Sequence, residues 1–464
     1  MPAVDEKPKP FLIPEYCKGC GRCVSVCVKG CIRFADEINP RTGLVPVVLD
    51  LANCTGCGLC IEACPEPYGL RAMAAGEDYT LLDPARLFGA KQSDAPEPVD
   101  IPARRVPLPH TQPLIIKGNY ASAVGALLAG CRHFYGYPIT PSTEGAELMS
   151  KLLPQLGGVF LQAVSEIATV NHMYGTGGAG LSSMTFTSGP GLSLMLEGIS
   201  YMVGSELPGV FVNIMRGGPG LGNIAPEQSD VKLACRGLGH GHSHCISLLP
   251  STPQEMLDYT ILAFELTQKY RNPVIILADG YLGQMTGKVQ LPDYMVKPGI
   301  PAWAVYGDRQ HRRNLITSIQ LQELDLEKFN QHLEDKYQAM KAEARAESYM
   351  TADADVVIVA ANTPARAAKG SVKSLREAGI KAGLFRPITI WPFPAEPLRA
   401  LLPTTRRLVV VEANAGGQIE DELRLSMSLA GVEKLPPITH VRRFGGMLPE
   451  QSEIVAHVKS ILGK

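Results

Sequence analysis

The chain has 464 residues, and a single hydrophobic core usually serves fewer residues than that, so we expect two or three domains. Hydrophobic residues make up 45% and charged residues 19%, and Lys+Arg (44) nearly balances Asp+Glu (45), which gives no support to a nucleic acid or an anionic membrane as partner. No apolar run is long enough to span a bilayer, and the opening MPAVDEKPKP lacks the apolar core of a secretory signal. We therefore expect a cytoplasmic protein.

Two runs of four cysteines with the same spacing lie near the N-terminus. In the first, two, two and three residues separate the cysteines, and the second repeats this spacing and is followed by Pro65. This is the spacing of bacterial two-cluster ferredoxins, in which three cysteines of one run and the fourth of the other hold each 4Fe-4S cluster. The predicted ligands are Cys17, Cys20, Cys23 and Cys64 for one cluster, and Cys54, Cys57, Cys60 and Cys27 for the other.

Other roles for these cysteines fit the pattern less well. Zinc sites use paired CxxC units, and the spacings are too short for ordinary disulfides. The first run departs from the ferredoxin pattern, because Cys27 is followed by Val28 and not by proline. A ninth cysteine, Cys31, could replace Cys27 as a ligand if the loop is remodelled, but we favour a buried spectator role for it. Cys131, Cys235 and Cys245 have no partner spacing and are expected to be small core residues.

The pattern of strands and helices divides the chain into five segments. We expect a small α+β ferredoxin domain over 11–84, a proline-rich extended linker over 85–112 that drapes over a neighbouring surface, and an α/β domain over 113–290. In that α/β domain, short apolar runs alternate with helical stretches, which indicates a parallel, doubly wound sheet; the runs are LIIKG, VFLQA, SSMTFTS, PGVFVNIM and NPVIILAD. A bridging segment over 291–350 contains an expected helix, LEKFNQHLEDKYQAMKAEARAESY, and a second α/β domain follows over 351–464.

Four motifs of the middle domain carry a family resemblance. They are GYPITPSTE, SEIATVNHMYGTGGAG, TSGPGLSLMLEGISY and MRGGPGLGNIAPEQSD, and together they resemble the α subunit of 2-oxoacid:ferredoxin oxidoreductases. The resemblance continues through KYRNPVIILADGYLGQM, FRPITIWPFP and VVEANAGGQI. It implies a pyrimidine-type domain of thiamine-diphosphate enzymes over 113–290 and a transketolase C-terminal-like domain over 351–464.

The same resemblance implies an enzyme that decarboxylates a 2-oxoacid to acyl-CoA and CO2. Thiamine diphosphate supplies the difficult chemistry, and electrons pass through the clusters to ferredoxin. The form of the arginine loop, MRGGPGLGNI, most resembles subunits acting on branched-chain 2-oxoacids such as 3-methyl-2-oxobutanoate. A 2-oxoglutarate or aryl-2-oxoacid enzyme, the reductive direction, and a non-catalytic electron-transfer and docking subunit remain alternatives.

Three residues take site roles by motif. Glu166 is expected to hydrogen-bond the aminopyrimidine ring of the cofactor, Thr140 to lie beside the substrate carboxylate, and Arg216 to hold that carboxylate. Taken alone, each has an ordinary interpretation: a helix first-turn charge, a turn threonine and a surface arginine. The family often has two acids where this chain has Ser165 next to Glu166.

The chain lacks the Gly-Asp-Gly motif through which thiamine enzymes bind the diphosphate and Mg2+, since ADGYLG (278–283) has the wrong lead residue. We therefore expect a partner β subunit carrying that domain, and a γ subunit that completes coenzyme A handling. The histidines of GHGHSH, His240, His242 and His244, could suggest a metal site on a strand, but a loop near the active site is favoured.

Overall fold

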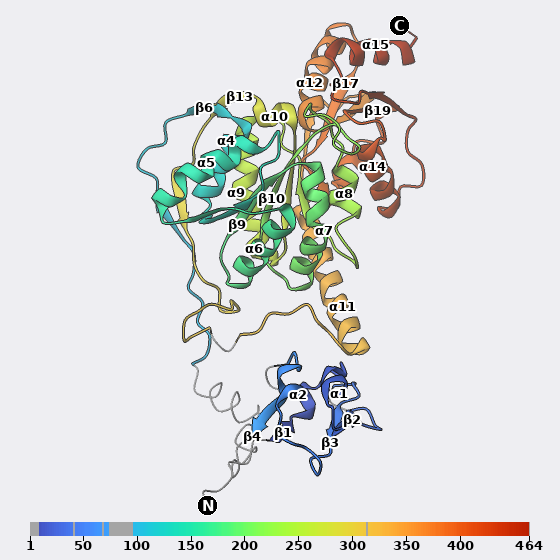
Figure 1. Ribbon diagram of the computed structural model, residues 1–464. Helices are drawn as coiled ribbons and strands as arrows, with labels where there is room; N and C mark the ends of the chain where they lie inside the picture. The colour runs from blue at the N-terminus through green and yellow to red at the C-terminus, as the bar shows by residue number, and fades with distance from the viewer. Residues whose placement is uncertain (1–8, 40–41, 67–68, 74–95, 312–313, 464) are drawn as a thin grey trace, which may run out of the picture. The chain divides into compact units, whose positions relative to one another are not determined.

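The computed structural model describes residues 9–39, 42–66, 69–73, 96–311 and 314–463. The chain divides into two compact units, Met1–Ala95 and Pro96–Lys464, which are described one at a time (Figure 1). None of the helices in the described ranges combines the length and the apolar character needed to cross a bilayer.

The described residues of the first unit form two antiparallel ribbons and two short α-helices. Strand β1 (Lys9–Leu12) pairs with β4 (Leu70–Met73), and β2 (Ile32–Phe34) pairs with β3 (Val47–Leu49), the strand predicted in VPVVLD. The helical elements are η1 (Pro14–Tyr16), α1 (Arg22–Val26) and α2 (Leu59–Glu62). Residues 74–84 of the expected ferredoxin domain and part of its expected NPRTG turn lie outside the described residues.

The hydrophobic core of this unit is very small. Among the described residues, the buried cluster consists of Ile32, Val47, Leu70 and three cysteines, and Phe11 is buried beside this set. A core of this size cannot offset the conformational entropy of folding, so the unit needs an additional source of stability. Metal clusters bound by the cysteines would supply it.

The second unit is built on a seven-stranded sheet. Six strands are parallel, and the edge strand β18 is antiparallel to β11. In spatial order the strands are β18 (Thr389–Trp391), β11 (Ile246–Leu248), β12 (Val274–Asp279), β10 (Val210–Met215), β9 (Ser183–Thr187), β7 (His133–Gly136) and β8 (Val159–Gln162). All residues of β9, β10 and β12 are buried, as expected for central strands covered on both faces.

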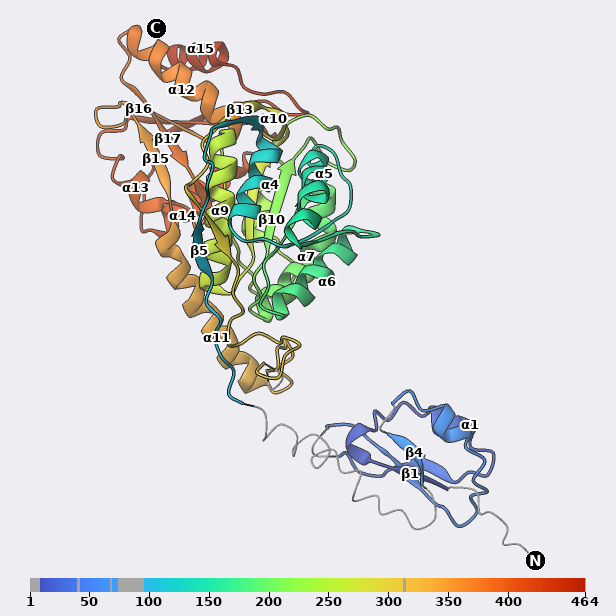
Figure 2. The same cartoon turned by 90° about the vertical axis from the view of Figure 1, so that its left-hand side faces the viewer.

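Helices cover both faces of this sheet, which confirms the predicted doubly wound arrangement. Figure 2 shows β10 between two helix pairs, and each pair packs internally, α4 with α9 and α6 with α7. The helices following the strands are α4 (Gly118–Leu128), α5 (Thr143–Leu152), α6 (Glu166–Gly178), α7 (Gly189–Gly204), α8 (Val231–Arg236), α9 (Pro253–Tyr270) and α10 (Gly280–Gln284), with η3 (Pro154–Leu156) after α5.

One predicted strand of the sheet lies elsewhere. LIIKG forms β6 (Leu114–Lys117), which pairs antiparallel with β13 (Thr286–Val289) in a separate ribbon. Ile115 is 77% exposed, so this run is not a buried central strand. The first strand of the sheet in chain order is instead β7.

The C-terminal part of the unit forms a second sheet of five strands. Their order is β15 (Ala346–Tyr349), β17 (Ala382–Pro387), β16 (Val356–Ala360), β19 (Arg407–Glu412) and β20 (Ile438–Arg442), all parallel except β15. The associated helices are α12 (Asn362–Glu377), α13 (Ala395–Arg399), α14 (Gln418–Leu429) and α15 (Gln451–Ile461).

A buried arginine ties this sheet to the first one. Arg386 on β17 donates two hydrogen bonds to the carboxylate of Glu255 on α9, at 2.6 and 2.9 Å, and a third to Glu347 on β15 at 2.8 Å. The guanidinium is 5% exposed. Because a buried charge is stable only when paired, this ion pair links α9 to the second sheet.

The bridging segment and the linker are more structured than expected. The helix α11 (Glu323–Met340) ends earlier than predicted, the turn η4 (Lys341–Glu343) follows, and the residues AESY form the edge strand β15. Within the expected linker, β5 (Arg104–Pro107) pairs antiparallel with β14 (Tyr294–Lys297). Residues 85–95 of the linker lie outside the described residues.

Candidate functional site

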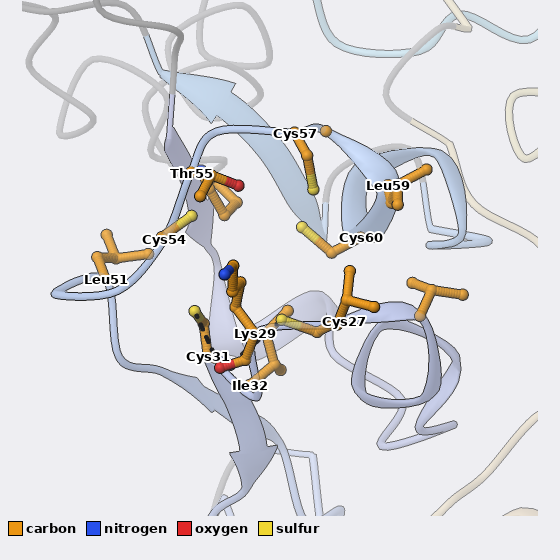
Figure 3. A pocket seen from close by; sticks show the side chains of 14 residues that line it. Cys27, Lys29, Cys31, Ile32, Leu51, Cys54, Thr55, Cys57, Leu59 and Cys60 are labelled. Atoms are coloured by element: carbon orange, nitrogen blue, oxygen red, sulfur yellow. Dashed lines mark hydrogen bonds between the residues drawn. The ribbon is translucent and has the colours of Figure 1, made fainter.

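The eight predicted cluster ligands line two separate cavities of the first unit. One cavity is lined by Cys17, Cys20, Cys23 and Cys64, and the other by Cys54, Cys57, Cys60, Cys27 and also Cys31 (Figure 3). The fourth cysteine of each run thus lies in the cavity of the other run. This is the crossed grouping that the spacing predicts, and the assignment of ligands remains a prediction.

The two runs adopt the same local structure. In each, the third cysteine lies in a short helix, Cys23 in α1 and Cys60 in α2, and the residue before that helix is a glycine in the left-handed conformation, Gly21 (φ 73°) or Gly58 (φ 81°). Residues with a Cβ rarely adopt this conformation. The glycine therefore lets the chain turn sharply between the second and third cysteine.

The arrangement suits clusters better than single ions. No group of three or more His, Cys, Asp or Glu side chains in the described ranges is placed to hold one metal ion. Instead, the thiols surround cavities, as a cube of four irons with four separated thiolates requires. Backbone amides also donate to the sulfurs, Val47 N to Cys17 Sγ at 3.4 Å and Cys31 N to Cys27 Sγ at 3.2 Å, contacts that stabilise thiolate charge.

The site motifs of the second unit meet at one edge of its seven-stranded sheet. The loop with Thr140 follows β7, Glu166 follows β8, the SGPG loop follows β9, and Arg216 follows β10. These strands are parallel, so all four loops lie at the carboxyl ends of the strands. Open α/β sheets bind their ligands at this edge.

Arg216 and Thr140 contact each other there. The Arg216 Nη1 donates to the carbonyl oxygen of Thr140 at 2.7 Å, and Nη2 donates to that of Leu221 at 3.3 Å. Arg216 is 9% exposed, and its Nε has no hydrogen-bond partner among the described residues. A buried guanidinium with an unused N–H donor can bind an anionic ligand.

Glu166 is the first residue of helix α6 and is 6% exposed. Its neighbour Ser165 caps the helix by accepting a hydrogen bond from Ala168 N at 3.2 Å, which leaves the Glu166 side chain free for another role. Within the described residues, the Glu166 carboxylate has no hydrogen-bond or ion-pair partner. A carboxylate on a residue this buried gains stability from a hydrogen-bond donor, so the residues present fit a ligand with a donor at this position.

The SGPG segment packs closely against that carboxylate. A Cβ on Gly191 would lie 2.3 Å from Thr187 Oγ1 and 2.6 Å from Glu166 Oε1, closer than real Cβ atoms approach. The glycine therefore allows helix α7 to pack directly against the Glu166 side chain.

Two further acids at this edge were not predicted from the sequence. Glu227 and Asp230 lie in the loop that begins at Arg216; both are buried, and burial raises the pKa of each carboxyl. Asp230 accepts a hydrogen bond from Asn213 Nδ2 at 2.9 Å, whereas Glu227 Oε2 has no partner among the described residues. Both acids belong to the motif MRGGPGLGNIAPEQSD. The sequence feature that could have pointed to them is a pair of carboxylates in a glycine-rich loop that follows a strand.

Asp279 of ADGYLG has a structural role. It caps helix α10 by accepting a hydrogen bond from Leu282 N at 3.0 Å, and it also accepts from the backbone amide and hydroxyl of Thr363, each at 2.8 Å. Both of its oxygens thus accept hydrogen bonds that join α10 to the start of α12.

The three histidines do not lie near this edge, contrary to expectation. They lie in the irregular segment that precedes β11, at the amino ends of the parallel strands. His244 stacks on Trp391 at 4.6 Å, and His242 Nε2 lies 2.9 Å from Glu334 Oε2. His242 and His244 border a cavity of about 560 Å³.

Cys131, Cys235 and Cys245 are buried, as predicted. Burial raises the pKa of the Cys131 thiol to about 12. A thiol that stays protonated does not act as a nucleophile.

Comparison with protein families gives three matches along the chain. Residues 124–360 match the model described as "Pyruvate flavodoxin/ferredoxin oxidoreductase, thiamine diP-bdg", residues 354–454 match "Pyruvate:ferredoxin oxidoreductase core domain II", and residues 16–67 match "4Fe-4S dicluster domain". The chain belongs to the 2-oxoacid:ferredoxin oxidoreductase family. The predicted resemblance is confirmed, as is the fold class with its added 4Fe-4S domain.

Individual relatives agree with this assignment. The ketoisovalerate oxidoreductase subunit VorB of Methanothermobacter marburgensis is 45% identical over 353 residues, covering 75% of this chain and 98% of the relative. The 2-oxoglutarate synthase subunit KorA of Methanothermobacter thermautotrophicus is 36% identical over 376 residues, covering 74% and 98%. The chain is thus an oxidoreductase subunit.

A solved structure shares the fold. It is the 2-oxoglutarate:ferredoxin oxidoreductase from Magnetococcus marinus with 2-oxoglutarate, coenzyme A and succinyl-CoA bound, and it matches with a TM-score of 0.68 and 29% identity. The match covers 75% of this chain and 65% of that chain.

Proposed function

We propose that this subunit contributes the pyrimidine-side half of a thiamine-diphosphate site to a CoA-dependent 2-oxoacid:ferredoxin oxidoreductase, with 3-methyl-2-oxobutanoate as substrate. The observation that carries the proposal is the buried Glu166 carboxylate, which has no partner among the described residues and lies at the ligand-binding edge of the sheet.

Each side chain then has a defined task. Thiamine diphosphate, when bound, stabilises the carbanion left by loss of CO2. Glu166 would hydrogen-bond the aminopyrimidine nitrogen and hold a proton there, which favours the tautomer that activates the thiazolium carbon. Arg216 would bind the substrate carboxylate with its guanidinium, and the Thr140 hydroxyl would donate beside it.

The surroundings of Arg216 support an aliphatic substrate side chain. Between Arg216 and Asp230 the loop contains no second basic residue, and its Leu221 and Ile224 are 82% and 61% exposed. A 2-oxoglutarate substrate has a second carboxylate, which needs its own cation or donors. The apolar loop and the similarity to a ketoisovalerate oxidoreductase subunit both favour the branched-chain substrate.

The proposed complex needs further components. A β subunit would bring the diphosphate-binding domain and Mg2+, and a γ subunit would complete coenzyme A handling. Two 4Fe-4S clusters, held by the two groups of four predicted cysteines, would pass electrons to ferredoxin.

The test is a CoA-dependent assay of the assembled complex with a viologen dye as electron acceptor. We expect 3-methyl-2-oxobutanoate to give the highest kcat/KM, followed at a distance by 2-oxoglutarate and aryl-2-oxoacids. Replacement of Glu166→Gln should lower kcat about 10- to 100-fold, because the amide cannot hold the proton at the ring nitrogen. Glu147→Gln, an exposed substitution on helix α5, is the matched control and should leave kcat unchanged.

Other outcomes would assign a different function. Unchanged turnover in Glu166→Gln would reject the catalytic role and favour an electron-transfer and docking subunit. A preference for 2-oxoglutarate would keep the catalytic role and reject the branched-chain substrate. If the complex carboxylates the acyl-CoA with reduced ferredoxin faster than it decarboxylates the 2-oxoacid, this would indicate the reductive direction.

A further inference from the structure

The cavity expected to hold the second cluster has one cysteine more than a 4Fe-4S cluster needs. It is lined by five cysteines, whereas the other cavity is lined by four. A 4Fe-4S cube has four irons and takes four protein thiolates. In Figure 3, Cys54, Cys57 and Cys60 face Cys27 and Cys31 across the cavity, so one iron has two candidate sulfurs.

The two candidates are in direct contact. The backbone amide of Cys31 donates to Cys27 Sγ at 3.2 Å, so the two residues lie at the same corner of the cavity. Cys31 is 6% exposed, and its thiol makes a weak contact of 3.8 Å with the Lys29 carbonyl oxygen and a second contact with the Cys27 side chain. Little has to be broken for this thiol to bind iron.

The loop between them has room to rearrange. Val28 is 86% exposed, and no atom lies within 4 Å of the place where a Cβ on Gly30 would be. In the other run, Pro65 follows Cys64, and its ring fixes the backbone after the fourth cysteine. Val28 imposes no such constraint after Cys27.

We propose that Cys27 and Cys31 are alternative ligands for the same iron of the second cluster. In the exchange, the Fe–Sγ bond to Cys27 breaks and a bond from iron to Cys31 Sγ forms, while the thiol proton of Cys31 passes to the released Cys27 thiolate. No electron is gained or lost. The proposal rests on the proposed assignment of two 4Fe-4S clusters to this chain.

The experiment compares single and double substitutions in the full chain, purified without oxygen together with its partner subunits. Iron and acid-labile sulfide are measured, and the dithionite-reduced clusters are examined by electron paramagnetic resonance (EPR). Cys27→Ala and Cys31→Ala should each keep about eight irons per chain, the content of two cubes. The double variant should lose the second cluster or convert it to a three-iron form.

Cys17→Ala is the matched control, because its cavity has no fifth thiol. It should lose iron as a single substitution. Equal iron loss in Cys27→Ala and Cys17→Ala would overturn the proposal. A wild-type chain with fewer than two clusters would instead refute the proposed cluster assignment, so the two failures are distinguishable.

A second comparison covers the case in which Cys27→Ala does not fold. Cys27→Ser is nearly isosteric, and under the proposal Cys31 restores thiolate ligation in it. Adding Cys31→Ala to Cys27→Ser should then change the EPR spectrum of the second cluster. An identical spectrum in the two variants would overturn the proposal.

Discussion

Replacing Gly191→Ala tests whether close packing of helix α7 positions the Glu166 carboxylate. The added Cβ would lie 2.3 Å from Thr187 Oγ1, 2.6 Å from Glu166 Oε1 and 2.9 Å from Glu166 Cγ. Three contacts this short cannot persist, so either the Glu166 side chain turns away or the start of α7 moves. Such overpacking typically costs about 1–3 kcal/mol of stability.

The larger effect is expected on catalysis. If the carboxylate moves, its charge-assisted hydrogen bond to the cofactor is lost, which is worth about 1.5–3 kcal/mol, or about 10- to 150-fold in rate. The assay is CoA-dependent dye reduction at saturating thiamine diphosphate, with the urea midpoint measured in parallel.

The matched control is Gly175→Ala in the exposed part of helix α6. No atom lies within 4 Å of its added Cβ, so this change should leave kcat unaltered and stabilise the helix by about 0.5–1 kcal/mol. If Gly191→Ala retains activity within about threefold of wild type, the packing of α7 does not position Glu166, and the reasoning fails.

Three further substitutions address binding, stability and pH dependence. Arg216→Lys loses the planar guanidinium, so KM for the 2-oxoacid should rise about tenfold or more while thiamine diphosphate affinity stays constant, as checked by steady-state kinetics and cofactor titration. Arg386→Met removes the buried guanidinium that pairs with the partly buried Glu255, whose side chain is 20% exposed, and should cost about 3–5 kcal/mol in urea unfolding. Arg406→Met is the control: this arginine side chain is 82% exposed in its ion pair, so the substitution should cost less than about 1 kcal/mol. Burial raises the pKa of Glu227, so its ionisation destabilises the fold as pH rises. The free energy of unfolding of Glu227→Gln should therefore exceed that of wild type by an amount that grows from about pH 5 to pH 8. A difference that stays constant over this range would contradict the prediction.

Much of the fold could be predicted from the sequence, because local patterns determine it. The buried strands β10 and β12 each contain a single polar residue, Asn213 and Asp279, and are otherwise apolar, and the cysteine spacing gives the grouping around two cavities. Strand β6 was misplaced since its apolar run is short, and periodicity cannot distinguish an exposed ribbon from a central strand. The end of α11 was also predicted wrongly, because no residue of AESY disfavours a helix. These residues form a strand because they pair with β17.

The candidate site also has parts that the sequence predicts and parts that it does not. Arg216, Thr140 and Glu166 each follow a strand, so parallel pairing alone brings them to one edge. The contact between Gly191 and Glu166 depends on the packing of two helices, and no sequence spacing encodes it. The role of Glu227 depends on burial within a folded loop, which composition does not reveal.

The edge strand β18 has a consequence for biosynthesis. It covers β11, yet it emerges from the ribosome about 140 residues later, roughly 7–30 s at ordinary elongation rates. During that interval the nascent sheet has an unpaired edge, the kind of surface on which strands of other chains can add. We expect a chain truncated before Thr389 to aggregate, and the growing chain to depend on chaperones or on early arrival of its partner subunit.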